Sequence, residues 1–148
     1  MEFIYREANP DDFKQIIKLV TEFAEYERRL DRMLNSEHRM LEEQEFFNGI
    51  VVEIPEKKIV AYLAYFICYF TWIGKSFYID DFYVKPEFRG QGIGKTLFDK
   101  AVEIAKESKC HKMRWQVSKW NNKAIEFYKN IGAEIEDIEL DCDLILDR

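Results

Sequence analysis

The most restrictive stretch of this sequence reads Phe88-Arg89-Gly90-Gln91-Gly92-Ile93-Gly94-Lys95-Thr96-Leu97-Phe98. Its three glycines alternate with other residues, between a strand-like aromatic segment and a segment with helical periodicity. Glycine has no Cβ, so the backbone can turn tightly and come close to a ligand. The first turn of the following helix offers unpaired N–H groups and a positive dipole end, which favour phosphate. The stretch therefore predicts a phosphate-binding loop, and an ordinary glycine-rich turn is the alternative.

Counting residues tests this loop against two better-known phosphate motifs. The nucleotide P-loop, G-x-x-x-x-G-K-[ST], would need a glycine where Arg89 stands. The dinucleotide motif, G-x-G-x-x-G, would need a glycine at Lys95. Both matches fail, and the pattern that remains is Arg-Gly-x-Gly-x-Gly over residues 89–94. It resembles the pyrophosphate loop of the GCN5-related N-acetyltransferases (GNAT), which bind acetyl-coenzyme A (acetyl-CoA).

Length and composition limit the class of protein. With 148 residues, 47% hydrophobic and 16% aromatic, the chain is expected to fold as a single domain over residues 1–148. A net charge of −6 disfavours nucleic acid as a partner. Three cysteines without a C-x-x-C pair fit a reducing compartment, and two histidines in no ligand pattern disfavour a metal. No signal-peptide pattern is visible, so we expect a cytoplasmic protein that does not bind membranes.

Hydrophobic periodicity predicts the order of the elements. Helices are expected at 10–27, after Ser36, after the glycine loop and at 122–131, and strands at 3–5, 50–54, 59–70, 76–84 and 113–117. The apolar run at 59–72 is too short for a bilayer, which needs roughly 20 residues, and is interpreted as a buried strand. Alternating apolar and acidic residues at 138–146 predict a half-exposed antiparallel strand. The order indicates an α+β fold, a mixed sheet with helices on both sides.

A second motif follows the strand expected at 113–117. Residues 121–133 read Asn-Asn-Lys-Ala-Ile-Glu-Phe-Tyr-Lys-Asn-Ile-Gly-Ala and predict an amphipathic helix that ends before Gly132. Taken alone, this is an ordinary capped helix. Together with the glycine loop, it resembles the N-x-x-A-x-x-F-Y signature of the GNAT cofactor site. Asn121 and Tyr128 lie about two helical turns apart, so both can face one ligand.

The resemblance extends to a subfamily and covers nearly the whole chain. Segments that match spermidine/spermine N1-acetyltransferases (diamine acetyltransferases) and their thialysine-acetylating relatives occur in the same order, at 24–27, 72–75, 78–84, 89–94 and 120–129. This resemblance implies the GNAT fold, a central, mostly antiparallel mixed sheet flanked by helices on both faces, and a homodimer. The short tail lacks the tryptophan typical of polyamine acetyltransferases, which weakens the polyamine assignment and leaves acetyl transfer intact.

The resemblance also implies a role for individual residues. Acetyl-CoA would be bound by Phe82, Tyr83, Val84, Arg89, Gly90, Gln91, Gly92, Ile93, Gly94, Lys95, Asn121, Lys123, Ala124 and Tyr128. Two residues would be catalytic: Tyr128 as the general acid near the thioester sulfur, and Asp80 as the base. The amine site would be lined by Tyr26, Glu27, Asp80, Asp81, Arg114, Trp115 and Gln116.

Asp80 and Asp81 are adjacent carboxylates inside an otherwise apolar strand. They are costly to bury without partners. Strict alternation would place them on opposite faces of the sheet, unless a β-bulge interrupts the strand. Asp81 is equally explained as a hydrogen-bonded core acid. The subfamily usually has Glu where Asp80 stands, and the shorter side chain favours proton transfer through a water molecule.

We therefore expect an enzyme that transfers an acetyl group from acetyl-CoA directly to a primary amine, in a ternary complex. The substrate would be a small molecule, either a polyamine or a lysine-like amino acid such as thialysine. An amine of pKa ~10 arrives protonated and needs a carboxylate to remove its proton, and a tyrosine can protonate the leaving thiolate. Two alternatives are acetylation of a protein or peptide and a non-catalytic acyl-CoA sensor. The presence of both Tyr128 and Asp80 argues against a sensor.

Overall fold

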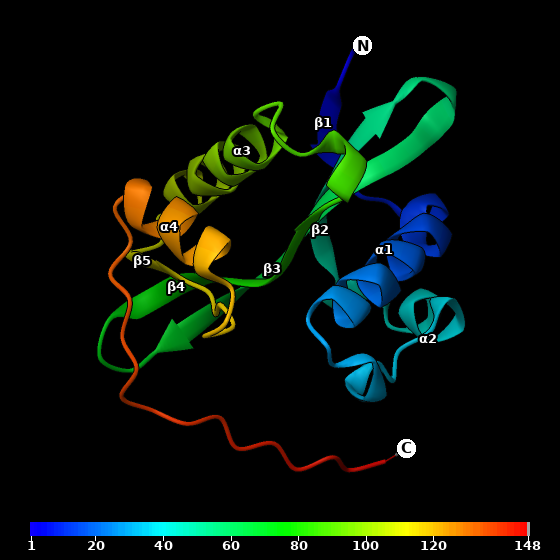
Figure 1. The fold of residues 1–148 in the computed structure, drawn as a ribbon. Helices are drawn as coiled ribbons and strands as arrows, with labels where there is room; N and C mark the ends of the chain where they lie inside the picture. Colours follow the sequence, from blue (N-terminus) through cyan, green and yellow to red (C-terminus); the bar gives the residue numbers. More distant parts are fainter. Residues whose placement is uncertain (148) are drawn as a thin grey trace. The chain divides into compact units, whose positions relative to one another are not determined.

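The central feature of the protein is a five-stranded sheet, seen in a computed structural model that describes residues 1–147 (Figure 1). The strands lie in the order β1 (Ile4–Glu7), β2 (Asn48–Ile54), β3 (Lys58–Phe70), β4 (Gly74–Val84) and β5 (Lys112–Arg114). β1 to β4 pair antiparallel, and β5 pairs parallel to β4. The helices are α1 (Phe13–Tyr26), α2 (Glu37–Glu42), α3 (Ile93–Glu107) and α4 (Asn122–Asn130). The predicted α+β class, with a mixed and mostly antiparallel sheet, is confirmed.

Short 3-10 helices mark most of the turns between these elements. They are η1 (Pro10–Asp12), η2 (Leu30–Arg32), η3 (Gln44–Phe46), η4 (Pro55–Lys57) and η5 (Pro86–Phe88). The start predicted for the first helix is confirmed by its capping contacts. The Asn9 side chain accepts from the Asp11 amide at 2.9 Å, and the Asp12 carboxylate accepts from the Asn9 amide at 2.8 Å. Arg6 of β1 donates to both Asp12 oxygens at 2.8 Å, which ties the sheet to the start of α1.

β4 contains a bulge at the pair of carboxylates. Ala64 of β3 pairs with Asp81, whereas the next residue, Tyr65, pairs with Ile79, so Asp80 is an extra residue without a partner on β3. Two residues of one strand then oppose one residue of the other, which bends the strand and changes the direction of its side chains. The bulge considered in the sequence analysis is therefore present, at Asp80.

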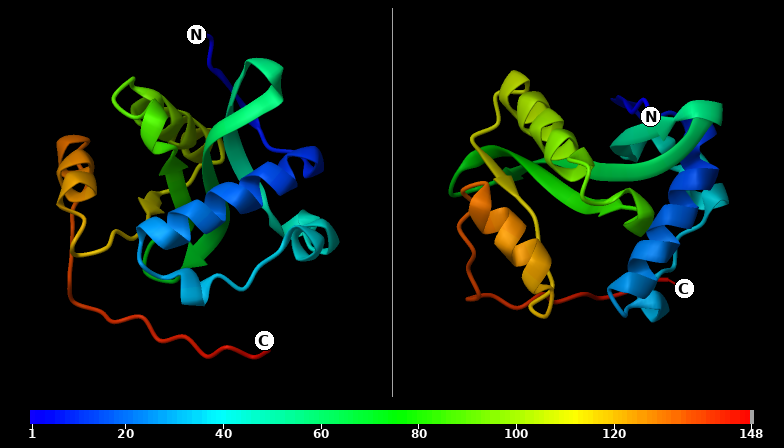
Figure 2. Two further views of the ribbon diagram at one scale, coloured as in Figure 1. Left: turned by 45° about the vertical axis from the view of Figure 1, so that its right-hand side comes forward. Right: turned by 45° about the horizontal axis from the view of Figure 1, so that its top comes forward.

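Beyond the bulge, successive β4 side chains face different helices. A Cβ built on Gly94 of α3 would lie 3.6 Å from Phe82 and 4.0 Å from Val84. Tyr83 points the other way and stacks on Phe23 of α1, with ring centroids 5.3 Å apart. α1 and α3 therefore cover opposite faces of the sheet, as Figure 2 shows, and the prediction of helices on both faces is confirmed.

The prediction of a buried strand over 59–72 is only half right. Residues 59–64 are buried, but Phe66 is 41% exposed, Tyr69 75% and Trp72 97%. The reason lies in the length of the neighbouring strand. β2 ends its pairing with β3 at Tyr65, so the remainder of β3 has only β4 beside it. The apolar run was long enough for a strand, but it carried no information on how far its neighbours extend.

Contacts between Cα atoms divide the chain into two compact units. Met1–Gln116 holds the sheet with α1, α2 and α3, and Val117–Arg148 holds α4 and the tail. In the second unit, Gly132 has a φ of +94° and ends α4 as predicted, with the Gly132 amide bonded to the Lys129 carbonyl and the Ala133 amide to the Tyr128 carbonyl. No helix within residues 1–147 is both long and apolar enough to cross a membrane.

The strand predicted at 138–146 is wrong. In the described part of the tail, residues 133–147, the chain forms neither helix nor strand. The apolar positions of the alternation are 82–91% exposed at Ile138, Leu140, Leu144 and Leu146. Alternation decides which face a side chain takes once a strand has a neighbour, but the strand itself requires hydrogen bonds from a neighbouring edge.

Candidate active site

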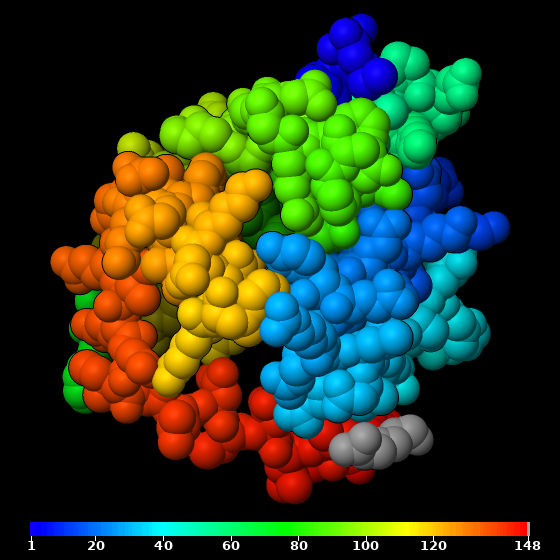
Figure 3. All heavy atoms as spheres, viewed as in Figure 1, coloured from blue at the N-terminus to red at the C-terminus, as the bar shows by residue number. Residues whose placement is uncertain are grey.

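The glycine loop joins η5 to α3 and has open space around its two turning points. Gly90 has a φ of +80° and Gly92 a φ of +82°, the left-handed region that favours glycine. A Cβ built on either would meet no atom within 4 Å, so the backbone conformation, not crowding, requires glycine there. Figure 3 shows atoms of η5 and this loop at the surface, bordering those of α1. Space above exposed backbone is what a pyrophosphate group needs.

α3 begins directly at this loop without a side-chain cap. The N-cap position of α3 is Gly92, which has no side chain to cap the helix, whereas the side chains of Ser36 and Asn121 cap α2 and α4. The amides of residues 93–95 have no acceptor within the helix, as at any helix start. These three N–H groups and the positive helix end fit an anion such as a pyrophosphate. The Lys95 ammonium instead pairs with Asp99 at 2.6 Å on the outer side of α3.

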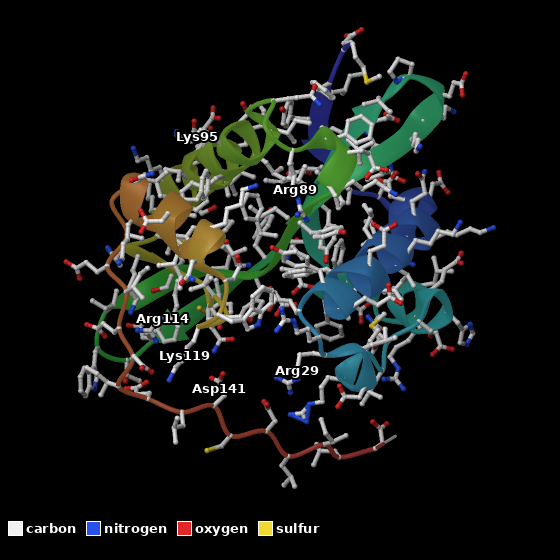
Figure 4. All side chains as sticks on the ribbon, viewed as in Figure 1. Arg29, Arg89, Lys95, Arg114, Lys119 and Asp141 are labelled. Carbon is white, nitrogen blue, oxygen red and sulfur yellow. The ribbon has the colours of Figure 1, made fainter. Side chains whose placement is uncertain are left out.

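Arg89 fixes the start of the loop against two other elements. Its Nε donates to the Val84 carbonyl at 2.8 Å, which ties the loop to the end of β4. Its guanidinium lies 4.9 Å from the centre of the Tyr26 ring and 5.4 Å from that of Tyr83. Figure 4 shows Arg89 between β4 and α1. Arg89 therefore links the predicted cofactor loop to Tyr26, which the sequence analysis placed in the amine site.

Gly92→Ala should weaken the binding of acetyl-CoA about fivefold. An alanine at a positive φ costs about 1 kcal/mol of conformational free energy. The free loop can avoid this cost by changing its conformation, but the bound loop cannot, so the cost weakens binding. Calorimetric titration with acetyl-CoA measures the dissociation constant. Gly132→Ala is the matched control, because Gly132 has a φ of +94° and equally open surroundings outside the loop. Equal weakening in both variants would mean that the loop conformation is not involved.

The α1 face of the sheet holds a cavity of about 150 Å³ next to the bulge. Both Asp80 and Asp81 line it, together with Tyr62 of β3, and Met40 of α2 and Phe47 contribute to its apolar wall. Among the described residues that line it, none is Lys, Arg or His. The bulge is the reason why two adjacent residues can serve one cavity. A partly apolar cavity with two carboxylates and no cationic side chain in its lining suits a molecule with a positive charge and an alkyl chain.

Burial shapes the protonation of both carboxyl groups. It raises the pKa of Asp80, which keeps more contact with solvent than Asp81 does. Burial also raises the pKa of Asp81 to about 7, with further contributions from the negative charges of Asp80 and Glu27. The Tyr62 hydroxyl donates to Asp81 Oδ2 at 3.3 Å and opposes this rise. Near neutral pH the cavity can therefore hold or release a proton.

The other residues predicted for the amine site lie outside the lining of this cavity. Tyr26 stands at the end of α1 under Arg89, and Glu27 follows it. Arg114 of β5 lies over the Phe70 ring at 4.7 Å, near the far end of β3 (Figure 4). Trp115 packs edge-on against Phe98 of α3, with centroids 5.1 Å apart, and Gln116 is exposed. The roles assigned to these five residues remain predictions.

Four predicted cofactor residues belong to the second unit. The Asn121 side chain accepts from the Ala124 amide at 3.2 Å and thereby caps α4. Tyr128 lies seven residues further along, on the same face of the helix, and is 8% exposed. Lys123 is exposed on the first turn. The capped helix of the sequence analysis is confirmed, and the contacts of these residues with a cofactor remain predictions.

Tyr62 is the site residue that sequence reasoning missed. It lies within the apolar run at 59–72, where a tyrosine is read as one more core aromatic. Its relation to Asp81 follows from the register of β3 against β4, which places Ala64 opposite Asp81 and Tyr62 opposite Tyr83. A correct hairpin register, counted with the extra residue at Asp80, is the signal that would have found it.

Comparison with known proteins places the chain in a family. The model of the Acetyltransferase (GNAT) family matches residues 4–133. The thialysine N-epsilon-acetyltransferase of Sus scrofa is 38% identical over 141 residues, 88% of this chain and 83% of that protein. The spermidine/spermine N(1)-acetyltransferase-like protein 1 of Homo sapiens is 30% identical over 88% of this chain but only 20% of its own length. The structure of a transcriptional regulator from Bacillus halodurans C-125 has a TM-score of 0.80 and 26% identity, covering 97% of this chain and 100% of that one. The chain belongs to the GNAT family and is an N-acetyltransferase.

Proposed function

We propose that the protein acetylates the primary amine of a small molecule in a ternary complex with acetyl-CoA. One observation carries the proposal: the bulge of β4 places two carboxylates in a cavity on the α1 face, while Phe82 and Val84 of the same strand contact the start of α3 on the other face. An amine held by the carboxylates and an acyl arm held along the backbone of Phe82 to Val84 would then lie next to each other at the bulge.

The protein's own groups would divide the work as follows. The glycine loop and the amides of residues 93–95 would bind the pyrophosphate, and the backbone of Phe82 to Val84 would hold the acyl arm. Acetyl-CoA would supply the activated acetyl group and the thiol leaving group. Asp80 would take the proton of the incoming ammonium through water, and Asp81 would hold the amine by its charge. Tyr128 would protonate the leaving thiolate.

The lining of the cavity and the relatives support the choice of substrate class. The lining offers carboxylates and apolar surface, which suit an amine on a flexible alkyl chain. The thialysine N-epsilon-acetyltransferases of three mammals are 36–38% identical to this chain and that of Caenorhabditis elegans is 30% identical, against 30% for the polyamine-type relative. We therefore place a lysine-like amine such as thialysine first and a polyamine second. Acetylation of a peptide is the alternative that the assay below tests.

A thiol-release assay with acetyl-CoA tests this proposal directly. The panel contains thialysine, lysine, spermidine, spermine, putrescine and a short peptide. We expect turnover on a small amine, with the identity of the best one deciding between the amino acid and the polyamine. Turnover on the peptide alone would replace the proposal with protein acetylation. Binding of acetyl-CoA without turnover on any of them would point to a sensor.

We also propose that the chain acts as one acetyltransferase domain and as a homodimer. The family match over residues 4–133 spans both compact units, which supports a single functional domain. The homodimer rests on the resemblance to the diamine and thialysine acetyltransferases. Light scattering of the purified protein measures the oligomeric state, and a monomer at micromolar concentration would contradict it.

A further inference from the structure

Tyr62 occupies an unusual position for a polar side chain. It lies in the middle of β3, is 1% exposed, and its ring belongs to the core between the sheet and α1. Tyr62 also lines the cavity, and its hydroxyl donates to Asp81 Oδ2 at 3.3 Å. A phenylalanine would fill the same volume, so packing alone does not require the hydroxyl. The hydroxyl therefore acts on Asp81.

The surroundings of Asp81 give this hydrogen bond its importance. β4 contributes the negative charge of Asp80, and the end of α1 contributes that of Glu27. The Tyr83 hydroxyl, two residues after Asp81 on β4, donates to Glu22 of α1 at 3.3 Å. α2 and η3 add no titratable side chain to the cavity lining. Every charged neighbour that acts on Asp81 favours its neutral form, and the Tyr62 hydroxyl favours the charged form.

The protonation of Asp81 matters because a protonated amine needs a negative partner. Burial of an ammonium group without a counter-charge is costly, and a neutral carboxylic acid supplies none. The same hydroxyl stays protonated at working pH, because burial and Asp81 raise the pKa of Tyr62 well above the usual value of a phenol. Tyr62 is therefore a permanent donor to Asp81.

We propose that Tyr62 is a positioning residue, which holds the Asp81 carboxylate in its charged form and so fixes the lowest pH at which the cavity binds a protonated amine. The inference rests on the proposed function, because it assigns the amine to this cavity. Because Tyr62 acts on amine binding, its replacement should change KM. The proton transfer assigned to Asp80 should instead affect kcat. No bond is made or broken by Tyr62.

Tyr62→Phe tests the proposal through the pH profile of kcat/KM. The acid limb of the wild-type profile should fall near pH 7, where Asp81 loses its charge. Loss of the hydroxyl should move this limb to higher pH by about one pH unit, since the charged carboxylate loses one hydrogen bond. Below pH 7, kcat/KM should then fall about tenfold through KM, with wild-type values restored above pH 9 and kcat little changed.

Two further variants predict different shifts of the acid limb and serve as controls. Asp80→Asn removes a neighbouring negative charge, so the acid limb should move to lower pH even though kcat falls. Tyr65→Phe removes the hydroxyl of another tyrosine of β3 and leaves the hydrogen bond between Tyr62 and Asp81 intact, so the limb should stay in place. A limb that moves the same way in all three variants, or in none, would overturn the proposal.

A titration of Asp81 by carboxyl-carbon NMR separates this inference from the proposed function. In the free protein the Asp81 signal should titrate at higher pH in Tyr62→Phe than in the wild type, and saturating thialysine or spermidine should lower the titration midpoint of the wild type. If no amine in the panel is acetylated, the proposed function fails, and these titrations still decide the inference. An Asp81 signal that ignores either the substitution or the amine would overturn the inference while leaving acetyl transfer intact.

Discussion

Tyr128→Phe is expected to lower kcat by about 10²–10³-fold, while acetyl-CoA binds within about twofold of the wild-type affinity. General acid catalysis by a positioned side chain contributes about this much, and the substitution removes only the proton donor. Phenylalanine should keep the packing of this residue on α4, because Tyr128 is buried there, with 8% of its surface exposed. Thiol release gives kcat, and calorimetry gives the affinity for acetyl-CoA.

A matched variant separates chemistry from structure at this tyrosine. Tyr69→Phe makes the same change at a residue that is 75% exposed on the far part of β3, and it should leave both quantities unchanged. If Tyr128→Phe lowers the affinity and kcat by the same factor, Tyr128 is a structural or binding residue. A loss of kcat that disappears with a substrate whose leaving group needs no proton would support the acid role further.

Asp81→Asn should raise the stability of the protein while it abolishes the binding of amines. The carboxyl group has a pKa of about 7 when folded, against about 4 in the unfolded chain. Between pH 4 and pH 7 the unfolded chain has therefore lost this proton while the folded protein retains it. The wild type loses stability as the pH rises through this window, and the asparagine variant does not. At pH 8 the variant should gain about 3 kcal/mol in free energy of unfolding relative to the same comparison at pH 4.

Urea unfolding at the two pH values measures this difference. Asp31→Asn is the control, because Asp31 is an exposed aspartate in η2 and its replacement should have little effect at either pH. A variant at position 81 that is less stable than the wild type at pH 8 would show that the charged form is already well compensated in the free protein. The stability and the amine affinity should change in opposite directions, because the charge that we propose binds the amine is costly to bury.

Local chemistry explains why much of this site could be predicted from the sequence. Gly90 and Gly92 adopt the left-handed conformation, in keeping with the tight turn that their spacing indicated, and Gly132 ends α4. These features are set by the backbone preferences of a few consecutive residues and do not require a distant segment of the chain. The possible bulge was also visible locally, because two adjacent carboxylates in one strand conflict with the alternation of its faces.

Features that depend on pairing between distant segments could not be predicted in this way. The contact of Tyr62 with Asp81 joins residues nineteen positions apart and depends on the register of a hairpin with an extra residue. The exposed half of β3 depends on where β2 ends, and the missing strand at 138–146 depends on the lack of a paired edge for it. In each case the sequence pattern was present, and the partner decided the outcome.

The extra residue at Asp80 has a consequence for insertions and deletions in β4. Removal of Asp80 alone would join Ile79 to Asp81 and give a regular ladder. All remaining paired residues of β4 would keep their partners on β3. Removal of any single residue between Phe82 and Val84 would instead exchange the residues that face α1 and α3. The pairing of β3 with β4 therefore does not itself require the extra residue. A variant that lacks Asp80 should keep its sheet while it loses one of the two carboxylates of the cavity.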